Sequence, residues 1–305
     1  MNFSSMDYFV MVAQEQSFTR AAERLHITQQ TLSAHIAGLE KEVGSRLFER
    51  TVPLTLTYAG RVFLEYAVDF RRKYQSLGQI MGDISSHKKG LLRIGISSIR
   101  GRATMPALIH SFHQKHPQIS VKLEEIGNDQ LVRLLMDGEI DLAVTDLPQT
   151  SPGLEVWNFY QEEIILAAAR SLLERLYGPQ ANLERRMERE GLAALEGCPF
   201  LLNSPYGVTG RFARGMLAQA GIIPNVLVES FNIETLLELC VLGEGACFCS
   251  EKLMRVALSQ EKIDTLTLFR LGKEGRCMIR FACLKQERRW SVLEDFIDVM
   301  LQNAV

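Results

Sequence analysis

The sequence predicts an α/β protein built from an N-terminal winged helix-turn-helix, one long helix and a two-lobed α/β domain. Two short helical patterns followed by two short strand patterns, within residues 17–60, indicate the first part. Apolar residues spaced three or four apart over residues 59–84 indicate the second. Strands alternate with helices from residue 90 onward, which is typical of a parallel α/β sheet. We therefore place the domains at 1–58, 59–89 and 90–305.

The segment over residues 28–43 is predicted to be the helix around which the N-terminal domain is organised. Thr28 can cap its start with a hydroxyl group. Leu32, Ile36 and Leu39 then recur at the spacing of one buried helix face. The opposite face is polar and carries Gln29, Gln30, Thr31, Ser33, Ala34 and His35. Such a helix, preceded by another at a tight turn, fits the major groove of DNA; the alternative is an ordinary pair of packed helices.

The flanking segments favour the DNA-binding interpretation. A helix over residues 6–15 can brace the pair, and Thr19 is predicted to cap the helix that precedes the turn. Gly44 is suited to end the organising helix in a left-handed conformation. Residues 47–50 and 54–56 then predict the two short strands of a wing.

These residues resemble the DNA-binding domain of the LysR-type transcriptional regulators. The matching residues are Phe9, Val12, Ser17, Phe18, Ala21, Ala22, Leu25, Gln29, Leu32, Ser33, Ile36, Leu39, Glu40, Gly44, Leu47, Phe48, Arg50, Leu56, Thr57 and Gly60. The sequence departs from the family's usual residues at Gln30, Ala34, His35 and Gly38. The resemblance implies binding to double-stranded promoter DNA. Our candidates for contacts to base edges are Gln29, Gln30, Ser33 and His35, and those for contacts to phosphates are Thr28, Thr31 and Arg50.

The long helix is predicted to begin after Thr57 and to end near residue 87. Its apolar stripe comprises Ala59, Val62, Phe63, Tyr66, Phe70, Tyr74, Leu77, Ile80, Met81 and Ile84. This spacing is that of a coiled-coil seam, so we expect two copies of the chain to pair through it. The alternative is a helix packed on its own domain. Residues 85–90 are polar or small and predict a hinge.

The remainder of the chain predicts two α/β lobes, about 90–160 with 270–305, and about 161–269. In the first, strands are expected at 91–96, 120–124, 140–144 and 154–168, with helices at 102–116 and 129–137. In the second, strands are expected at 199–202, 226–229, 246–249 and 265–270, with helices at 209–220, 233–242 and 251–257. A strand at 278–285 returns to the first lobe, and a helix at 290–301 ends the chain. Residues 178–191 look like an inserted, charged helix.

This two-lobed pattern resembles the effector domain of the same family, which is built like a type 2 periplasmic binding protein. The resemblance rests on Met105-Pro106, Phe112, His116-Pro117 and residues 138–144 in the first lobe. In the second lobe it rests on Pro199-Phe200 and residues 243–245. It implies a small-molecule effector held between the lobes, and pairing of dimers into a tetramer.

Ligands of open α/β sheets bind beyond the carboxyl ends of the strands, beside helix N-termini. The residues expected to bind the effector are therefore those that follow strands: Ser97, Ser98, Thr145, Asn203, Ser204, Thr209 and Phe231. Hydroxyl and amide groups at facing helix N-termini suit a carboxylate or another small anion, and Arg100 and Arg102 can add positive charge. Asp146 opposes an anion if it points inward. The alternative for each polar residue is that it only caps its helix.

Composition fits this interpretation without deciding it. Residues 1–90 hold 11 Lys and Arg against 9 Asp and Glu, and the rest holds 23 against 27. Phosphate contacts supply most non-specific affinity for DNA, so a chain of such low charge is expected to bind as an oligomer. No run approaches the roughly 20 apolar residues of a membrane helix, and no signal peptide is visible, so we expect a cytoplasmic protein without membrane partners. The cysteines lie mostly in apolar runs, which favours buried, reduced thiols over redox sensing: Cys198, Cys240, Cys247, Cys249, Cys277 and Cys283.

No motif favours catalysis or a bound cofactor. The chain has no phosphate loop, no G-x-S-x-G sequence and no paired carboxylates in a defined cleft. His110, His113 and His116 share a helix, but the third turns away from the first two, so we expect no metal site. The expected function is a LysR-type regulator that responds to a small molecule. The alternatives are a solute-binding protein that does not bind DNA and, less favoured, an enzyme.

Overall fold

The computed structural model describes residues 3–49, 51–84, 90–286 and 288–304. The chain divides into two compact units, with the division between residues 87 and 88. Each unit has its own hydrophobic core. The predicted hinge at 85–90 lies outside the described residues except for Gly90, and so does Arg50.

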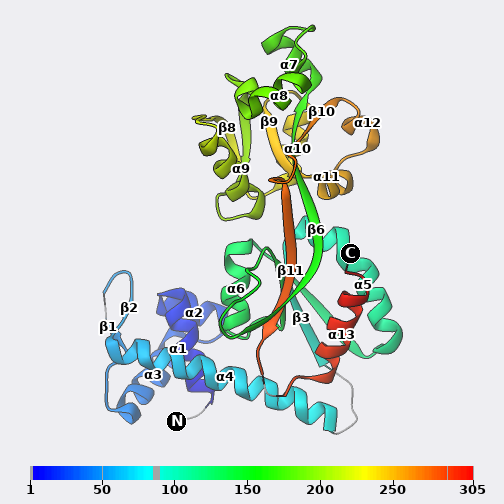
Figure 1. Cartoon of the computed structure of the whole chain (residues 1–305). Helices are drawn as coiled ribbons and strands as arrows, with labels where there is room; N and C mark the ends of the chain where they lie inside the picture. Colours follow the sequence, from blue (N-terminus) through cyan, green and yellow to red (C-terminus); the bar gives the residue numbers. More distant parts are fainter. Residues whose placement is uncertain (1–2, 50, 85–89, 287, 305) are drawn as a thin grey trace. The chain divides into compact units, whose positions relative to one another are not determined.

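The N-terminal unit, in its described residues, consists of four helices and a two-stranded antiparallel sheet (Figure 1). Its elements are α1 (Phe3–Glu15), α2 (Phe18–Arg24), α3 (Gln29–Val43), β1 (Phe48–Glu49), β2 (Thr55–Leu56) and α4 (Tyr58–Ile84). The fully buried rings and aliphatic chains of Phe9, Leu32, Leu39 and Leu47 hold the helices together. Phe48 packs against Phe9 and Phe18, so strand β1 is anchored on the helical core.

The helix boundaries of this unit follow from its capping groups. The predicted cap at Thr28 is confirmed, because its hydroxyl accepts a hydrogen bond from the N–H of Thr31 over 3.1 Å. Gly44 ends α3 with a φ of 72°, as predicted. The predicted cap at Thr19 is wrong: Ser17 is extended and accepts from the N–H of Arg20, so α2 begins two residues earlier.

Helix α4 has two apolar faces rather than one continuous seam. Ala59, Phe63 and Ala67 pack into the core of the N-terminal unit. Seven other large apolar residues of this helix are exposed: Tyr58, Val62, Tyr66, Phe70, Tyr74, Leu77 and Met81. These seven residues, called the α4 stripe below, recur every three or four positions, so each lies next to the following one in a row that winds gradually around the helix. The alternative, a helix packed on its own domain, is thus correct for part of the predicted seam and incorrect for the rest.

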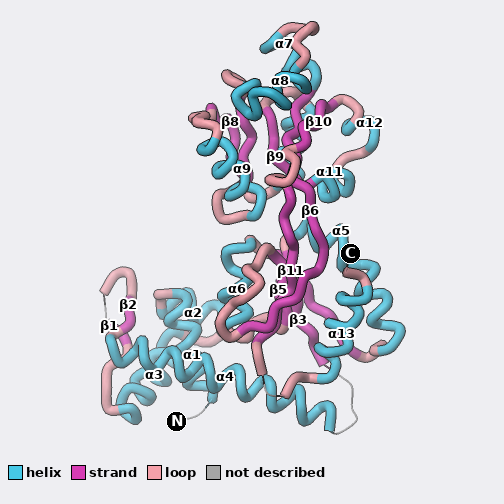
Figure 2. Tube along the Cα trace, viewed as in Figure 1, coloured by secondary structure: helices cyan, strands magenta, loops and turns pink. Residues whose placement is uncertain are grey.

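The C-terminal unit contains two lobes on a continuous nine-stranded sheet, with helices flanking the strands (Figure 2). The strand order is β4-β3-β5-β11-β6-β9-β7-β8, and β10 pairs with β6. The first lobe comprises β3 (Gly90–Ile96), α5 (Ser98–Lys115), β4 (Ile119–Glu125), α6 (Asn128–Met136), β5 (Leu142–Thr145), β11 (Arg276–Leu284) and α13 (Ser291–Gln302). Strands β3, β4 and β5 are parallel, as the alternating pattern predicted.

The second lobe repeats this arrangement. It comprises α7 (Arg170–Tyr177), α8 (Leu183–Glu190), the 3₁₀ helix η1 (Gly191–Leu195), β7 (Pro199–Asn203), α9 (Val208–Gln219), β8 (Asn225–Ser230), α10 (Ile233–Val241), β9 (Ala246–Ser250), α11 (Glu251–Ala257), α12 (Gln260–Ile263) and β10 (Leu266–Arg270). Strand β6 (Leu154–Ala169) runs through both lobes: it pairs with β11 in its first part and with β9 and β10 in its second (Figure 1).

Two helical segments differ from the prediction, and a third agrees with it. Helix α5 begins at Ser98 instead of residue 102, so Arg100 and Gly101 belong to its first turn. Helix α7, which follows the crossing strand directly, was not predicted. The charged insertion at 178–191 does contain a helix, α8, capped by Asn182. None of the helices in the described part of the chain is both long and apolar enough to cross a membrane.

Candidate functional site

Helix α3 presents the predicted polar face. Leu32, Ile36 and Leu39 are at most 2% exposed, so the helix is fixed with its other side toward solvent. Gln29, Gln30 and Thr31 are exposed, and Ser33 is half-buried. The first residues of a helix also present unpaired backbone N–H groups, which bind phosphate oxygens well. The N-terminal part of α3 can therefore contact both base edges and the DNA backbone.

Some candidate side chains already have partners within the unit. The hydroxyls of Thr28 and Thr31 hydrogen-bond to each other over 2.8 Å, and Thr28 also caps the helix. Gln29 accepts from Thr19 of α2 over 3.5 Å. These contacts orient the N-terminal turn of α3 and leave the second hydrogen-bonding capacity of each group for a ligand.

His35 lies apart from the other candidates. Its Nδ1 is 3.4 Å from the Ser5 hydroxyl, and its ring packs edge-on against Tyr8 of α1. This side chain thus stabilises the contact between α1 and α3 instead of extending the outer face. Arg50 lies outside the described residues, so its predicted phosphate contact remains a prediction.

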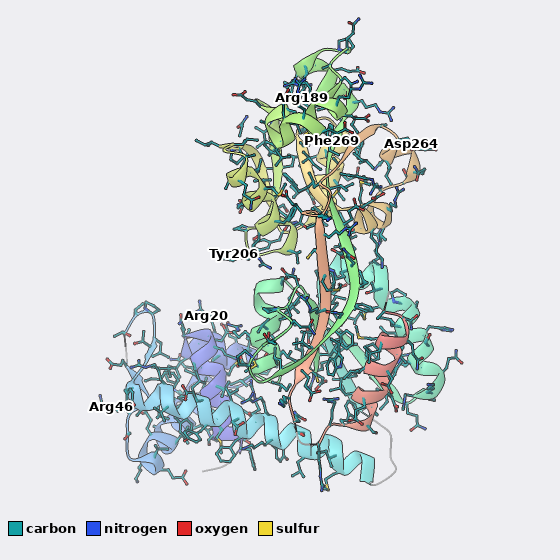
Figure 3. The ribbon with its side chains drawn as sticks, in the orientation of Figure 1. Arg20, Arg46, Arg189, Tyr206, Asp264 and Phe269 are labelled. Atoms are coloured by element: carbon teal, nitrogen blue, oxygen red, sulfur yellow. The ribbon has the colours of Figure 1, made fainter. Side chains whose placement is uncertain are left out.

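The outer face of α3 also contains residues that the sequence analysis did not select as contacts. Ala34, Ala37, Gly38 and Lys41 are all exposed. Three of these four positions have little or no side chain, which allows close approach of the helix backbone to a groove. Arg46 is exposed on the segment between α3 and β1 (Figure 3). Lys41 and Arg46 could have been found by asking which basic residues flank the recognition face.

The C-terminal unit contains a cavity of about 430 Å³ lined by residues from both lobes. Five strand-to-helix junctions meet there: β3 to α5, β4 to α6, β7 to α9, β8 to α10 and β9 to α11. Its lining residues are Ser97, Ser98, Ile99, Arg100, Glu125, Ile126, Gly127, Asn128, Gln130, Asn203, Gly207, Val208, Thr209, Phe231, Asn232, Ile233, Glu234, Ser250 and Leu253. A volume of this size suits a small molecule.

Five of the seven predicted effector residues line this cavity: Ser97, Ser98, Asn203, Thr209 and Phe231. Thr145 and Ser204 do not. Thr145 is buried and donates its hydroxyl to Asp146 over 3.1 Å. Ser204 is buried and accepts from the backbone N–H of Tyr206 over 3.4 Å, which shapes the loop before α9 (Figure 3). Both hydroxyls therefore serve the local structure.

A buried ion pair lies beneath the first turn of α5. Arg100 donates to both carboxylate oxygens of Glu162 on β6, over 3.2 and 3.0 Å, and the Tyr160 hydroxyl donates to the same carboxylate over 3.0 Å. The two charged side chains are 4% and 1% exposed. Burial alone would lower the pKa of Arg100, but the Glu162 carboxylate outweighs it and the pKa is raised. Burial, and next the charge of Glu162, raise the pKa of Tyr160.

Arg100 also orients a predicted effector residue. It donates to the Ser97 hydroxyl oxygen over 3.2 Å. Because Ser97 makes no side-chain hydrogen bond to cap α5, its hydroxyl proton is available to a ligand. The pairing of Arg100 with Glu162 means that the arginine contributes a donor to the cavity without contributing net charge.

Two further ion pairs join the lobes near the cavity. Arg102 of α5 donates to Glu234 of α10 over 2.8 Å and to the carbonyl of Val256 in α11. Arg211 of α9 pairs with Asp146, which follows β5. Asp146, which we expected to oppose an anionic ligand if it pointed inward, is thus neutralised by the opposite lobe. These ion pairs are half-exposed, so each is expected to contribute at most about 1 kcal/mol to the free energy of unfolding.

The cysteines do not form a reactive site. Five are buried and Cys277 is half-buried, and all six are free thiols. Burial raises the pKa of Cys198 to about 11 and that of Cys240 to about 12. Such thiols stay protonated at neutral pH and react slowly, which agrees with the expectation of buried reduced cysteines.

Comparison with known proteins identifies the family. Residues 3–61 match the bacterial regulatory helix-turn-helix protein family of LysR type, and residues 85–305 match the LysR substrate binding domain. The chain belongs to the LysR family of bacterial transcriptional regulators. Among its relatives, this LysR-family chain is 33% identical to the uncharacterized HTH-type transcriptional regulator YcgK of Bacillus subtilis, over 84% of the chain and 82% of that protein.

Solved structures agree with the fold of this LysR-family protein. A full-length OxyR variant from Pseudomonas aeruginosa matches with a TM-score of 0.67 and 22% identity, over 98% of this chain and 94% of that one. Full-length CbnR, in complex with its target DNA, matches with a TM-score of 0.61 and 24% identity over the whole of both chains. Membership of this family favours a transcriptional regulator over a solute-binding protein without a DNA-binding domain. The relatives give no support for catalysis.

Proposed function

We propose that this LysR-type regulator binds double-stranded promoter DNA through α3 and the wing, and that a small molecule in the interlobe cavity changes that binding. The observation that supports the effector role most strongly is the cavity itself, because five strand-to-helix junctions from both lobes converge on it. Effector contacts are assigned to Ser97, Ser98, Asn203, Thr209 and Phe231. Base contacts are assigned to Gln29, Gln30 and Ser33.

DNA contact, pairing and effector binding are assigned in turn to the proposed domains at 1–58, 59–89 and 90–305. The α4 stripe exposes seven large apolar side chains along a 27-residue helix. Pairing of two such helices would remove this surface from water, and would place two α3 helices on one DNA molecule. Two contact surfaces on DNA also compensate for the low positive charge of the single N-terminal unit. Dimers that pair again through the effector domains would form a tetramer that holds separated half-sites.

Coupling between cavity and DNA requires a ligand that favours one arrangement of the lobes over another. The pairs Arg211–Asp146 and Arg102–Glu234 join the lobes at the edge of the cavity. A ligand that contacts both lobes adds further bonds across the same gap. It would therefore stabilise the closed arrangement relative to an open one, and an assembly that senses closure would hold DNA differently.

Selection from random double-stranded DNA with the full-length protein tests the DNA-binding role. We expect enrichment of one sequence family with two related half-sites, and loss of that enrichment in a Gln29→Ala/Ser33→Ala variant. Native mass spectrometry of the purified protein tests the effector role: wild type is expected to retain or take up a small molecule that a cavity-filling Ser98→Trp variant excludes. Enrichment of no sequence, or equal uptake by both proteins, would contradict the corresponding half of the proposal.

A further inference from the structure

The polar groups of the cavity that lack partners are of two opposite kinds. On the first lobe the one unpaired charge belongs to an acceptor, although the Ser97 hydroxyl also offers a donor there. Glu125 ends β4 and lines the cavity, and its carboxylate forms no ion pair or hydrogen bond with another described side chain. A ligand group that binds this carboxylate must donate hydrogen bonds and tolerate a negative neighbour.

The position of Glu125 also affects the first turn of α5. A Cβ atom on Gly101 would lie 3.2 Å from Oε1 of Glu125, so the carboxylate lies against this turn. The positive end of the α5 dipole is therefore already faced by an anion. A second anion placed there would meet the Glu125 charge directly, which makes the first lobe a poor place for a ligand carboxylate.

On the second lobe the start of helix α9 offers hydrogen-bond donors. Helices α10 and α11 are capped by their own residues, since Asn232 and Ser250 accept from backbone N–H groups. Two helices at the cavity follow a glycine that cannot cap them with a side chain, namely α6 after Gly127 and α9 after Gly207. Of the two, α9 has 12 residues and belongs to the lobe opposite Glu125. The N–H groups of its first turn and the Thr209 hydroxyl are thus available to an acceptor in the cavity.

The remaining charges at the cavity are internally balanced. Arg100 is paired with Glu162, and Glu234 is paired with Arg102. The unpaired lining charge among the described residues is therefore the single negative charge of Glu125. The lining also includes apolar side chains from both lobes, among them Ile99, Ile233 and Leu253.

From this arrangement we infer that the effector is an amino-acid-like zwitterion with an apolar side chain, whose ammonium group binds Glu125 and whose carboxylate binds the α9 N-terminus and Thr209. The inference rests on the proposed function and specifies the ligand class of that cavity. A simple carboxylate would leave the acceptors of the first lobe unpaired and add a like charge near Glu125. A zwitterion satisfies both ends, adds no net charge and bridges the lobes.

Calorimetry and thermal shift on the full-length protein test the inference with matched probes. The first set contains L-valine, L-leucine, L-methionine and L-phenylalanine; the second contains the same molecules without the amino group, and the third contains them without the carboxylate. We expect at least one amino acid to bind, and its two truncated counterparts to bind roughly tenfold more weakly or worse, because a bond to a charged group contributes about 1.5–3 kcal/mol.

A pair of neighbouring variants isolates the role of Glu125. Glu125→Gln removes the charge from an exposed side chain and should raise the Kd of the amino acid about tenfold while leaving the carboxylate probe unaffected or better bound. Glu124→Gln makes the same chemical change one residue away, where the carboxylate pairs with Lys122 over 2.6 Å outside the cavity lining, and should leave every Kd unchanged.

Three results would overturn the inference: a carboxylate probe that binds as tightly as its amino acid, equal effects of the two variants, or no binding by any amino acid to protein that binds DNA. Failure of the proposed function looks different. If a carboxylate probe binds and alters DNA binding, the sensor stands and the ligand class fails. If an amino acid binds as described but DNA binding never responds, the ligand class stands and the sensor fails.

Discussion

Glu162→Leu is expected to destabilise the C-terminal unit strongly. The substitution removes the acceptor of two Arg100 hydrogen bonds and one Tyr160 hydrogen bond in a place where both charges are at most 4% exposed. Leaving one charge of a buried pair without its partner costs about 3–5 kcal/mol. For a unit of this size, each kcal/mol shifts Tm by about 2–4 °C, so a fall of roughly 6–20 °C is expected.

The double variant Arg100→Met/Glu162→Leu separates the charge effect from general damage to packing. It removes both charges and leaves mainly the Tyr160 hydroxyl without an acceptor, a cost of about 1–3 kcal/mol. The double variant should therefore be more stable than Glu162→Leu alone. Both can be measured by thermal and urea denaturation followed by circular dichroism. A Tm of Glu162→Leu within about 2 °C of wild type, or a double variant less stable than the single one, would refute the reasoning.

Three further predictions concern the other parts of the chain. The Gln29→Ala/Ser33→Ala variant should bind its selected DNA at least roughly 30-fold more weakly, because each of the two base contacts contributes about 1–3 kcal/mol, while its affinity for random DNA changes little in a fluorescence-anisotropy titration; equal loss on both would exclude base recognition by these residues. Tyr66→Ser/Phe70→Ser should convert dimers to monomers in sedimentation, since these side chains are 63% and 46% exposed on the α4 stripe, whereas Glu65→Ser on the same helix should not; an intact dimer in the double variant would contradict pairing through α4. The native protein at about pH 7.5 should react slowly with Ellman's reagent and all six thiols should react promptly once it is unfolded, because burial raises the pKa of Cys198 to about 11 and of Cys240 to about 12; rapid native labelling of either would contradict the buried, protonated state.

The sequence was most informative where structure depends on neighbouring residues. The stripe of Leu32, Ile36 and Leu39, the cap at Thr28 and the terminator at Gly44 all act within a few residues, and each is confirmed. The start of α2 was misplaced because Ser17 and Thr19 both offer hydroxyls. What decides between them is the extended backbone of Ser17 and the contact of Phe18 with Phe48, which is distant along the chain.

Long-range pairing explains most of what the sequence could not show. Arg100 was expected in a loop, whereas it lies in the first turn of α5, which starts at Ser98. It pairs there with Glu162, which is 62 positions away in the sequence. The same is true of Asp146, whose charge is balanced by Arg211 of the other lobe. Local sequence patterns contain no information on which distant charges meet.

The cavity was predicted in outline and incompletely in detail. The strand-end rule selected five residues that line it, yet it also selected Thr145 and Ser204, whose hydroxyls serve their own loops. Glu125 and Asn128 were missed, although they follow the strand expected at 120–124 and the same rule would have found them. The signal was present. Glu125 was passed over because hydroxyl and amide groups were favoured, and the amide of Asn128 was missed because the rule was not applied to this strand end.

The claim that a small molecule between the lobes changes how the protein holds DNA is tested most directly by footprinting. The full-length protein is footprinted on its selected DNA with and without the probe that binds most tightly in calorimetry. The account predicts a changed footprint length, or a change in DNA affinity of about fivefold or more, in wild type, and no change in the cavity-filled Ser98→Trp variant. An unchanged footprint and affinity, at a probe concentration that saturates the cavity of wild type, would contradict it.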